Sequence, residues 1–342
     1  MRLAVFAFSR RGQATAERIV RALSGEETVC AAYTPERLAG GGFAPIPKPS
    51  GAFYGGLFQS RDALVFVGAA GIAVRAIAPH VRSKTTDPAV VCVDELGHFV
   101  IPLLSGHIGG ANALAERLAE TLGAVCAVTT ATDVNRRFSV DRWAAEQGYV
   151  IDDMRAAKTV SAAILEGDVP LCSALPLGTA LPAGVVPGAS GAAGIYIGWE
   201  KRAPFAVTLR LIPRVLCLGL GCRRGTEAGV IDAAVSAVLE ENSIDPRAVR
   251  TAASIDLKAA ETGLLTCCEA RGWPLAFYTA AQLEAVSGHF TPSAFVRSVT
   301  GVDNVCERAA LAGGAKQLIV KKTARTGVTV AVAAEQTEVR FD

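Results

Sequence analysis

The sequence predicts an α/β protein with two three-layer α/β domains, whose mainly parallel sheets are joined by a smaller middle segment. Three observations predict this fold class. Short apolar runs alternate with stretches of helical periodicity, first over residues 62–135 and again from 214 onward. A Pro- and Gly-rich region separates these two parts. Hydrophobic residues make up 51% of the 342 residues and charged residues 19%, a balance that favours large buried cores over disorder.

The predicted N-terminal α/β domain covers residues 1–138. The run LAVFAF is a strand, and helical spacing follows over 13–23. After a turn-rich stretch at 40–56, ALVFVG predicts a buried strand and IAVRAIAPHV a helix. AVVCVDELGHFVIPLL predicts two strands with a turn at 95–97. SGHIGGAN then opens a helix, and AVCAVTTATD predicts a further strand.

The predicted middle segment, residues 139–213, has a helical stretch followed by a Pro- and Gly-rich run. The C-terminal α/β domain covers 214–342. It begins with RVLCLGLGCRRGT, a strand feeding a glycine-rich loop, and then alternates helices with VRTAASIDLK, a strand that leads into a loop, and the strand PLAFYT. Thr279 is a predicted N-cap. The last two strands, QLIVKKT and VTVAVAA, are joined through a turn at 326–327.

Composition and charge exclude several classes of function. The formal net charge of +2 gives no overall field for holding nucleic acid or an anionic membrane. The first apolar run is short and is followed by two arginines, unlike a secretory signal, and no apolar stretch is long enough to span a bilayer. The nine cysteines are odd in number and show no CxxC spacing, which favours buried thiols over zinc ligands. The expected compartment is the cytoplasm.

The densest group of candidate functional residues is LLSGHIGGAN, residues 103–112. Its members are Ser105, Gly106, His107, Gly109, Gly110 and Asn112. The glycines let a ligand approach the backbone, and free amides at a helix start favour a carboxylate or an oxyanion. His107 can exchange a proton near neutral pH. The alternative is a turn in which Ser105 caps the helix and His107 bonds locally, and the spacing alone does not decide between them.

Ser105 does not stand in the nucleophile pattern G-x-S-x-G, because position 103 is leucine. A serine nucleophile is therefore not indicated. Attack by water, with His107 or a nearby carboxylate as the base, is the simpler hypothesis.

A second group lies in residues 68–97. Arg75 and Lys84 are candidate partners of carboxylates, and Asp94 and Glu95 are candidate acid or base groups. Taken singly, each is more often a solvated surface charge. His80 and His98 are expected to be structural.

The third group is GLGCRRGT, residues 219–226. It resembles the dinucleotide fingerprint G-x-G-x-x-G, but Arg224 stands where the third glycine belongs, which counts against NAD or FAD. Arg223 and Arg224 in a glycine loop suit an organic acid better. The alternative is a strand-to-helix turn with exposed arginines.

Four further residues are candidate ligands of the substrate in the C-terminal domain. Ser254, Asp256 and Lys258 follow a predicted strand in ASIDLKAAETG. Glu307 lies near the start of a predicted helix, where the pattern favours an exposed position over a buried carboxylate.

Several of these segments together resemble one enzyme family. The stretches are GxAVRxIAP and KxxDPAVVxxDExGxFVIxLLSGHxGGAN in the first half, and LGLGCRRGT, ASIDLKxxExGL and GVxxVCExAAL in the second. They resemble the cobalt-precorrin-5A hydrolase family of the anaerobic cobalamin pathway over roughly residues 60–135 and 214–335. The second half is also similar to a small stand-alone protein of the aerobic cobalamin pathway, so we expect a separable corrinoid-handling module.

The resemblance implies the reaction. In that family the ring-A acetate δ-lactone of a cobalt-bound tetrapyrrole is hydrolysed, acetaldehyde leaves and cobalt-precorrin-5B remains, a hydrolysis at a carbon–carbon bond. Cobalt arrives with the substrate, so neither a cofactor nor a protein metal site is expected, and the neighbouring methyltransferases of the pathway are candidate partners. The hypothesis is that water attacks the lactone, amides around Gly109 and Gly110 stabilise the oxyanion, and His107, Asp94 and Glu95 transfer protons.

Two alternatives remain at this point. One is a non-catalytic corrinoid carrier or chaperone of the same pathway. The other is a nucleotide-dependent oxidoreductase, suggested only by GLGCRRGT and the α/β pattern.

Overall fold

The computed structural model describes residues 1–25, 27–83, 86–107 and 109–342. The chain forms two compact units, Met1–Arg142 and Trp143–Asp342. The second unit contains one sheet from the middle segment and another from the C-terminal segment. The α/β class with mainly parallel sheets is confirmed. The three-part domain division stays a prediction.

The first unit is built on one seven-stranded sheet in the order β3-β2-β1-β4-β5-β6-β7, in which only the β5–β6 pair is antiparallel. The strands are β1 (Arg2–Ala7), β2 (Val29–Pro35), β3 (Phe43–Ile46), β4 (Ala63–Val67), β5 (Ala89–Val93), β6 (Phe99–Leu104) and β7 (Val125–Cys126). The helices are α1 (Arg10–Leu23), η1 (Glu36–Leu38), α2 (Gly51–Ser60), α3 (Ala70–Ile77), η2 (Ala78–His80), α4 (Ala111–Leu122) and α5 (Ala131–Val134). Helix α6 (Val140–Glu146) leads from the first unit into the second.

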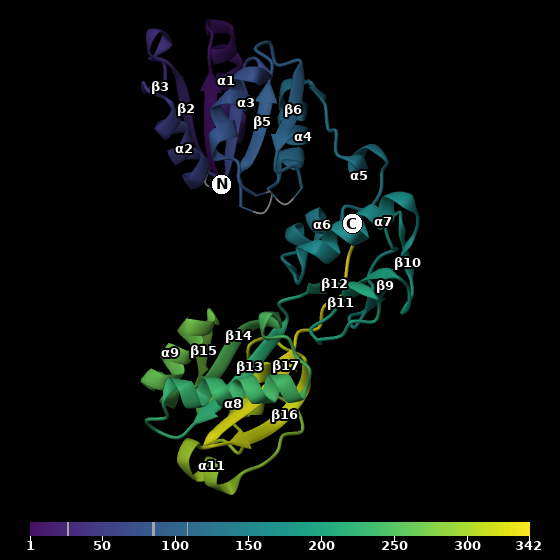
Figure 1. The fold of residues 1–342 in the computed structure, drawn as a ribbon. Helices are drawn as coiled ribbons and strands as arrows, with labels where there is room; N and C mark the ends of the chain where they lie inside the picture. Colours follow the sequence, from purple (N-terminus) through teal and green to yellow (C-terminus); the bar gives the residue numbers. More distant parts are fainter. Residues whose placement is uncertain (26, 84–85, 108) are drawn as a thin grey trace. The chain divides into compact units, whose positions relative to one another are not determined.

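Helices cover both faces of this sheet because its central strands are apolar on both sides (Figure 1). Leu3 and Val5 of β1 belong to a core cluster with α1 and α4. The alternate residues Ala4 and Phe6 belong to the cluster that includes α2 and α3. Because successive side chains of a strand point to opposite faces of the sheet, α1 and α4 pack on one face and α2 and α3 on the other.

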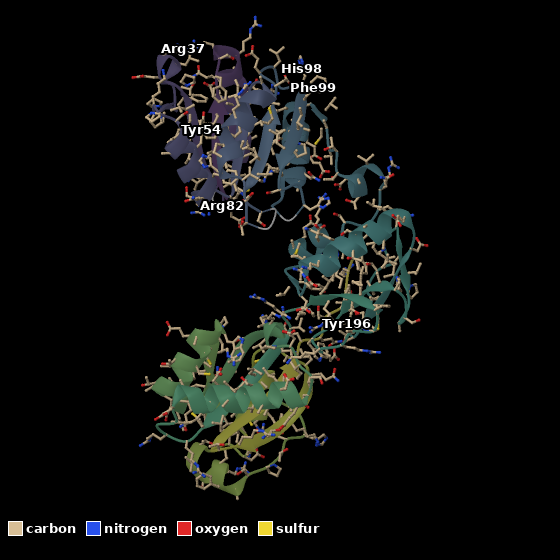
Figure 2. The ribbon with its side chains drawn as sticks, viewed as in Figure 1. Arg37, Tyr54, Arg82, His98, Phe99 and Tyr196 are labelled. Atoms are coloured by element: carbon tan, nitrogen blue, oxygen red, sulfur yellow. The ribbon has the colours of Figure 1, made fainter. Side chains whose placement is uncertain are left out.

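The reversed strand β6 places its two ends at opposite edges of the sheet. The hairpin that begins at Asp94 lies where the parallel strands β4 and β5 end. Ser105, after the end of β6, lies where those strands begin, and its hydroxyl bonds the Asp87 carbonyl ahead of β5. Figure 2 shows His98 and Phe99 at one end of the first unit and Arg82 at the other.

The middle sheet has the strand order β10-β9-β11-β12-β8 and pairs in parallel except at β12–β8. Its elements are β8 (Val150–Ile151), α7 (Met154–Glu166), β9 (Val169–Ser173), β10 (Val185–Pro187), β11 (Ala193–Ile197) and β12 (Val207–Ile212). Three of these strands lie in the run that the sequence marks mainly by Pro and Gly. They are short, so the sequence contains no long alternation of apolar and polar residues that would predict them.

The C-terminal sheet has the order β15-β14-β13-β17-β16. Its strands are β13 (Leu216–Cys222), β14 (Val249–Ile255), β15 (Leu275–Tyr278), β16 (Gln317–Arg325) and β17 (Val328–Ala334). Its helices are α8 (Ala228–Glu241), η3 (Pro246–Ala248), η4 (Asp256–Lys258), α9 (Thr262–Arg271), α10 (Ala280–Glu284), α11 (Ala294–Thr300) and α12 (Cys306–Ala312). Helices α8 and α9 share one core cluster, whereas α12 belongs to the other. The predicted 326–327 turn and the Thr279 cap are confirmed.

Four charged side chains, the Arg–Asp brace, join the middle sheet to the C-terminal sheet. Arg210 of β12 contacts Asp152 at 3.1 Å and Asp245 at 2.9 Å. Arg247 pairs with the same two carboxylates, and its contact with Asp245 is 2.8 Å long. Against the desolvation that burial imposes, hydrogen bonds from Arg247 and Arg210 lower the pKa of Asp245 to about 2.

The last residues, 335–342, form a strap that returns from β17 to the middle sheet (Figure 1). Val339 is fully buried, and its N–H donates to the Pro176 carbonyl. The Trp143 indole donates to the Arg340 carbonyl at 2.9 Å, and its ring stacks on Phe341 with centroids 4.8 Å apart.

Two features are absent from the described residues. None of their helices combines the length and the apolar character that a membrane span requires. Nor do any three His, Cys, Asp or Glu side chains among them gather in a way that could hold a metal ion. All nine cysteines carry free thiols.

Candidate active site

The loop that follows β6 is held tightly to the strand before it. Ser105 is buried and takes the left-handed conformation, with φ 58°, and its hydroxyl donates to the Asp87 carbonyl at 2.9 Å. A Cβ on Gly109 would lie 2.3 Å from the Ser105 Cβ, so only glycine fits there. The Ser105 hydroxyl therefore anchors the loop, and the structure shows no contact between it and His107.

The amides at the start of α4 are largely used within the loop itself. The Gly110 N–H donates to the His107 carbonyl at 2.9 Å, and the Asn112 N–H donates to the Gly106 carbonyl at 2.9 Å. Gly110, with φ 80°, is the N-cap, so Ser105 does not cap this helix. The expectation that the Gly110 amide is free for an oxyanion is wrong, because a loop carbonyl already accepts its hydrogen.

His107 lies between two carboxylates that follow it in the sequence. Its Nε2 is 3.0 Å from Asp133 Oδ2, and its Nδ1 is 3.2 Å from Asp141 Oδ1. The hydroxyl of Ser139 lies within 3.2 Å of Nδ1 and 3.1 Å of Nε2. The histidine side chain is 17% exposed, so it is mostly buried but within reach of solvent.

Asp133 is itself held from three further sides. Asn112, which is 1% exposed, donates to Asp133 Oδ2 at 2.9 Å and to Thr130 at 3.0 Å. The Thr130 hydroxyl also donates to this carboxylate. Arg142 lies 3.7 Å from the other carboxylate oxygen. The predicted residue Asn112 thus positions Asp133 directly, and also through the Thr130 hydroxyl that it contacts.

This arrangement favours the charged forms of its members. The hydrogen bond to Asp141, reinforced by Asp133 and opposed by burial, raises the pKa of His107 above its ordinary value. Against the desolvation of its surroundings, hydrogen bonds from Thr130 and His107 lower the pKa of Asp133. The geometry and both shifts favour an imidazolium between carboxylates, a form that can donate a proton.

Asp94 and Glu95 lie at the opposite edge of the sheet from His107. The Asp94 carboxylate accepts hydrogen bonds from the backbone of Leu96 and His98 and thereby shapes the hairpin. Glu95 accepts a hydrogen bond of 2.6 Å from the Ser9 hydroxyl. Strand β6 spans the sheet between them and His107, so the structure does not bring these candidates together.

The first unit contains two basic candidates, Arg75 and Lys84. Arg75 is exposed in the last turn of α3 and lines a pocket between α2 and α3. Lys84 lies outside the described residues.

The arginines of the second unit lie at the end of β13. Arg224 is exposed and lines a pocket of about 720 Å³ at the starts of α8 and α9. Arg223 is also exposed, and its side chain packs on Gly327 of the β16–β17 turn. Both arginines are therefore exposed, which was one of the two alternatives that the sequence left open, and Arg224 also lines a pocket.

Three more candidates follow β14. Ser254 is fully buried, and its hydroxyl donates to the Leu220 carbonyl at 2.7 Å, so it links β14 to β13. Asp256 is exposed in η4. Lys258 pairs with Glu261 at 2.9 Å, and Glu261 also accepts the Gly225 N–H at 2.9 Å. The salt bridge thus fixes the wall of the same pocket.

Glu307 is fully buried, and the expectation of an exposed position is wrong. Its carboxylate accepts hydrogen bonds from the Thr291 N–H and hydroxyl, from Asn304 Nδ2 and from the Lys322 N–H, at 2.7 to 2.9 Å. Four donors compensate the burial of the charge. Glu307 thereby ties the loop before α11 to α12 and β16.

The sequence reasoning missed Asp133, Asp141 and Ser139. A signal for Asp133 was present, because it follows AVCAVTTAT, the stretch that contains β7 and runs parallel to β6. The ends of neighbouring parallel strands meet at one sheet edge. Asp141 lies at the start of α6, and no motif marks it.

Comparison with known proteins identifies the family. The models "Cobalamin synthesis G N-terminal" and "Cobalamin synthesis G C-terminus" match residues 52–133 and 216–333. The cobalt-precorrin-5A hydrolase of Salmonella typhimurium is 35% identical over 345 residues, which cover 96% of each chain. The chain belongs to the cobalt-precorrin-5A hydrolase family.

A second family member, the cobalt-precorrin-5A hydrolase of Priestia megaterium, is 33% identical over 81% of this chain and 79% of its own. Protein CobE of a Sinorhizobium species is 38% identical over 125 residues, 36% of this chain and 81% of CobE. The N-terminal family model spans the His107 loop and ends at Asp133. The resemblance of the second half to a small stand-alone protein of the cobalamin pathways is confirmed.

Proposed function

We propose that this chain hydrolyses the ring-A acetate δ-lactone of cobalt-precorrin-5A in anaerobic cobalamin biosynthesis, releasing acetaldehyde and leaving cobalt-precorrin-5B. Membership of the family supports the reaction, at 35% identity over nearly the whole chain. The observation that carries the site is His107 between Asp133 and Asp141, at 3.0 and 3.2 Å.

The first step opens the lactone. Water attacks the carbonyl carbon and gives up its two protons to solvent, the acyl C–O bond breaks, and the ring-A acetate becomes a carboxylate. The departing alkoxide needs a proton, which the His107 imidazolium supplies. Asp141 holds Nδ1, so Nε2 is the donating atom. A substrate oxygen takes the place of the Ser139 hydroxyl beside Nε2 and competes with Asp133 Oδ2, 3.0 Å away, for this proton.

The second step releases the two-carbon fragment. The new hydroxyl group loses its proton while the bond between its carbon and the macrocycle breaks, and acetaldehyde forms. The electron pair of that bond stays on the conjugated macrocycle. His107, now neutral, accepts the hydroxyl proton and returns to the imidazolium form, so one histidine serves both steps.

The cobalt in this proposal belongs to the substrate, and the protein needs no resident cofactor. The methyltransferases that act before and after it in the pathway are the proposed partners. The proposed compartment is the cytoplasm, with which nine free cysteines agree.

The test is an anaerobic assay of acetaldehyde release with His107→Gln and the matched control His98→Gln. His98 is exposed on the β5–β6 hairpin, at the opposite end of β6. Loss of an acid–base group lowers the rate by roughly 100- to 10,000-fold, so we expect that loss in the first variant and an unchanged rate in the second. Full activity of His107→Gln would remove His107 from the mechanism. Binding of the lactone by the unaltered protein without any acetaldehyde would identify a carrier instead.

A further inference from the structure

A second polar pocket, of about 300 Å³, lies in the first unit between α2 and the α3–η2 segment. Ile72 and Ala76 give it an apolar wall. Ser50, Tyr54, Arg75 and His80 supply its polar groups. This volume is at the small end of ligand sites, which suits one short side arm of a ligand rather than a macrocycle.

None of these four polar side chains has a hydrogen-bond partner among the described residues. The His80 Nε2 is closed off from solvent without any partner. Ser50 precedes α2 but its hydroxyl does not cap that helix. The guanidinium of Arg75 and the hydroxyl of Tyr54 bond to no other described side chain. Buried polar groups are as a rule paired, so the unpaired His80 Nε2 indicates a missing partner at this pocket, and the more accessible Arg75 and Ser50 are available to a ligand there.

The pocket is also held in shape by its surroundings. The His80 ring lies flat on α2, because a Cβ at Gly55 would be 2.8 Å from its Cε1. Phe58 packs near the same ring, with centroids 6.1 Å apart. Tyr54 is 8% exposed, and burial raises its pKa, so the phenol keeps its proton and donates.

We propose that this pocket binds one carboxylate group, with Arg75 as its ion-pair partner and Tyr54, Ser50 and His80 as hydrogen-bond donors. All four groups can donate, so the fitting ligand is an acceptor with negative charge. A planar guanidinium matches the two oxygens of a carboxylate. That the carboxylate is a side arm of the tetrapyrrole rests on the proposed function, whereas binding of a carboxylate does not.

The first experiment measures binding directly in the full chain. Propionate is titrated into ¹⁵N-labelled protein, the His80 imidazole signals are followed by NMR, and a His80→Gln variant assigns them among the four histidines. Propionamide is the neutral control ligand. Arg117→Ala, which removes an exposed arginine of α4, is the matched control for Arg75→Ala.

We expect a saturable shift with propionate in the wild type and in Arg117→Ala, and no shift with propionamide. In Arg75→Ala the affinity falls about tenfold or more, because a charge-assisted pair is lost. An equal response in Arg75→Ala, or an equal response to propionamide, overturns the proposal. Tighter binding of inorganic phosphate than of propionate overturns the assignment to a carboxylate.

The second experiment decides where the carboxylate comes from. If it is a side arm of the lactone substrate, Arg75→Ala raises KM for acetaldehyde release about tenfold and leaves kcat within about twofold. An unchanged KM together with lost propionate binding refutes the substrate arm and assigns the pocket to a free small acid. Should no lactone activity exist at all, the propionate titration still tests the pocket.

Discussion

Replacing Asp245 with asparagine tests the Arg–Asp brace between the two sheets of the second unit. Asparagine keeps the shape of the side chain and one acceptor oxygen but removes the charge that Arg210 and Arg247 share. The carboxylate is 2% exposed, so solvent screens it little. The variant therefore isolates the contribution of the negative charge.

The magnitude follows from the pKa of Asp245, which falls from 3.8 to about 2 on folding. At roughly 1.4 kcal/mol for each pKa unit, this carboxylate contributes about 2.5 kcal/mol to the free energy of unfolding at pH 7. A carboxyl group with a depressed folded pKa stabilises above its unfolded pKa. The contribution is lost as pH falls from about 4 to about 2, and about half of it remains at pH 3.

Urea unfolding followed by tryptophan fluorescence measures this loss of stability in the second unit, which contains Asp245. All three tryptophans of the chain lie in that unit, namely Trp143, Trp199 and Trp273. We expect the deficit of Asp245→Asn relative to wild type to shrink between pH 7 and pH 3. Glu241→Gln breaks an exposed ion pair with Arg325 and serves as the control, with a loss under about 1 kcal/mol. A deficit equal at both pH values would refute the electrostatic reasoning.

Three further predictions concern the site around His107. In Asp141→Asn the pKa of His107 falls, so kcat/KM begins to decline at a lower pH as the imidazolium is lost. The control Asp153→Asn alters only the cap of α7 and leaves the pH profile unchanged. An unmoved pH profile in Asp141→Asn would exclude the proposed effect of Asp141 on His107. Gly109→Ala forces the His107 loop away from Ser105, and a displacement of about 1 Å lowers the rate of acetaldehyde release about 100-fold. The control Gly123→Asn lies at an open left-handed position and retains the rate. Prolonged dialysis against EDTA leaves the release of acetaldehyde from cobalt-loaded substrate intact, and a loss restored by added zinc would contradict the proposed absence of a resident metal.

The sequence predicts the β6–α4 loop because its signal is local. Glycines 106, 109 and 110 mark a strand-to-helix turn, and the structure shows why two of them are required: a Cβ at 106 or 109 would collide with Asn112 or Ser105. The partners of His107 could not be predicted, because they depend on the order of strands in the sheet. Asp133 reaches the histidine only because β7 lies beside β6.

Burial was equally hard to predict from single residues. Glu307 and Ser254 belong to polar-looking stretches, yet both are fully buried, because backbone groups of neighbouring segments pair with them. Asp94 shows the opposite case, a carboxylate in a family motif that shapes a hairpin. A motif thus marks a position under constraint, and only the tertiary structure tells whether chemistry or folding imposes it.

The strap at 335–342 changes how the second unit should be divided. The chain leaves the middle sheet after Ile212, builds the whole C-terminal sheet and then returns, so the C-terminal part is an insertion within the middle one. Its entry and exit lie side by side, since Leu216 pairs with Ala334. An inserted domain with adjacent ends can exist as an independent protein, in agreement with the match to CobE. Its host, by contrast, is completed only when residues 335–342 have been synthesised.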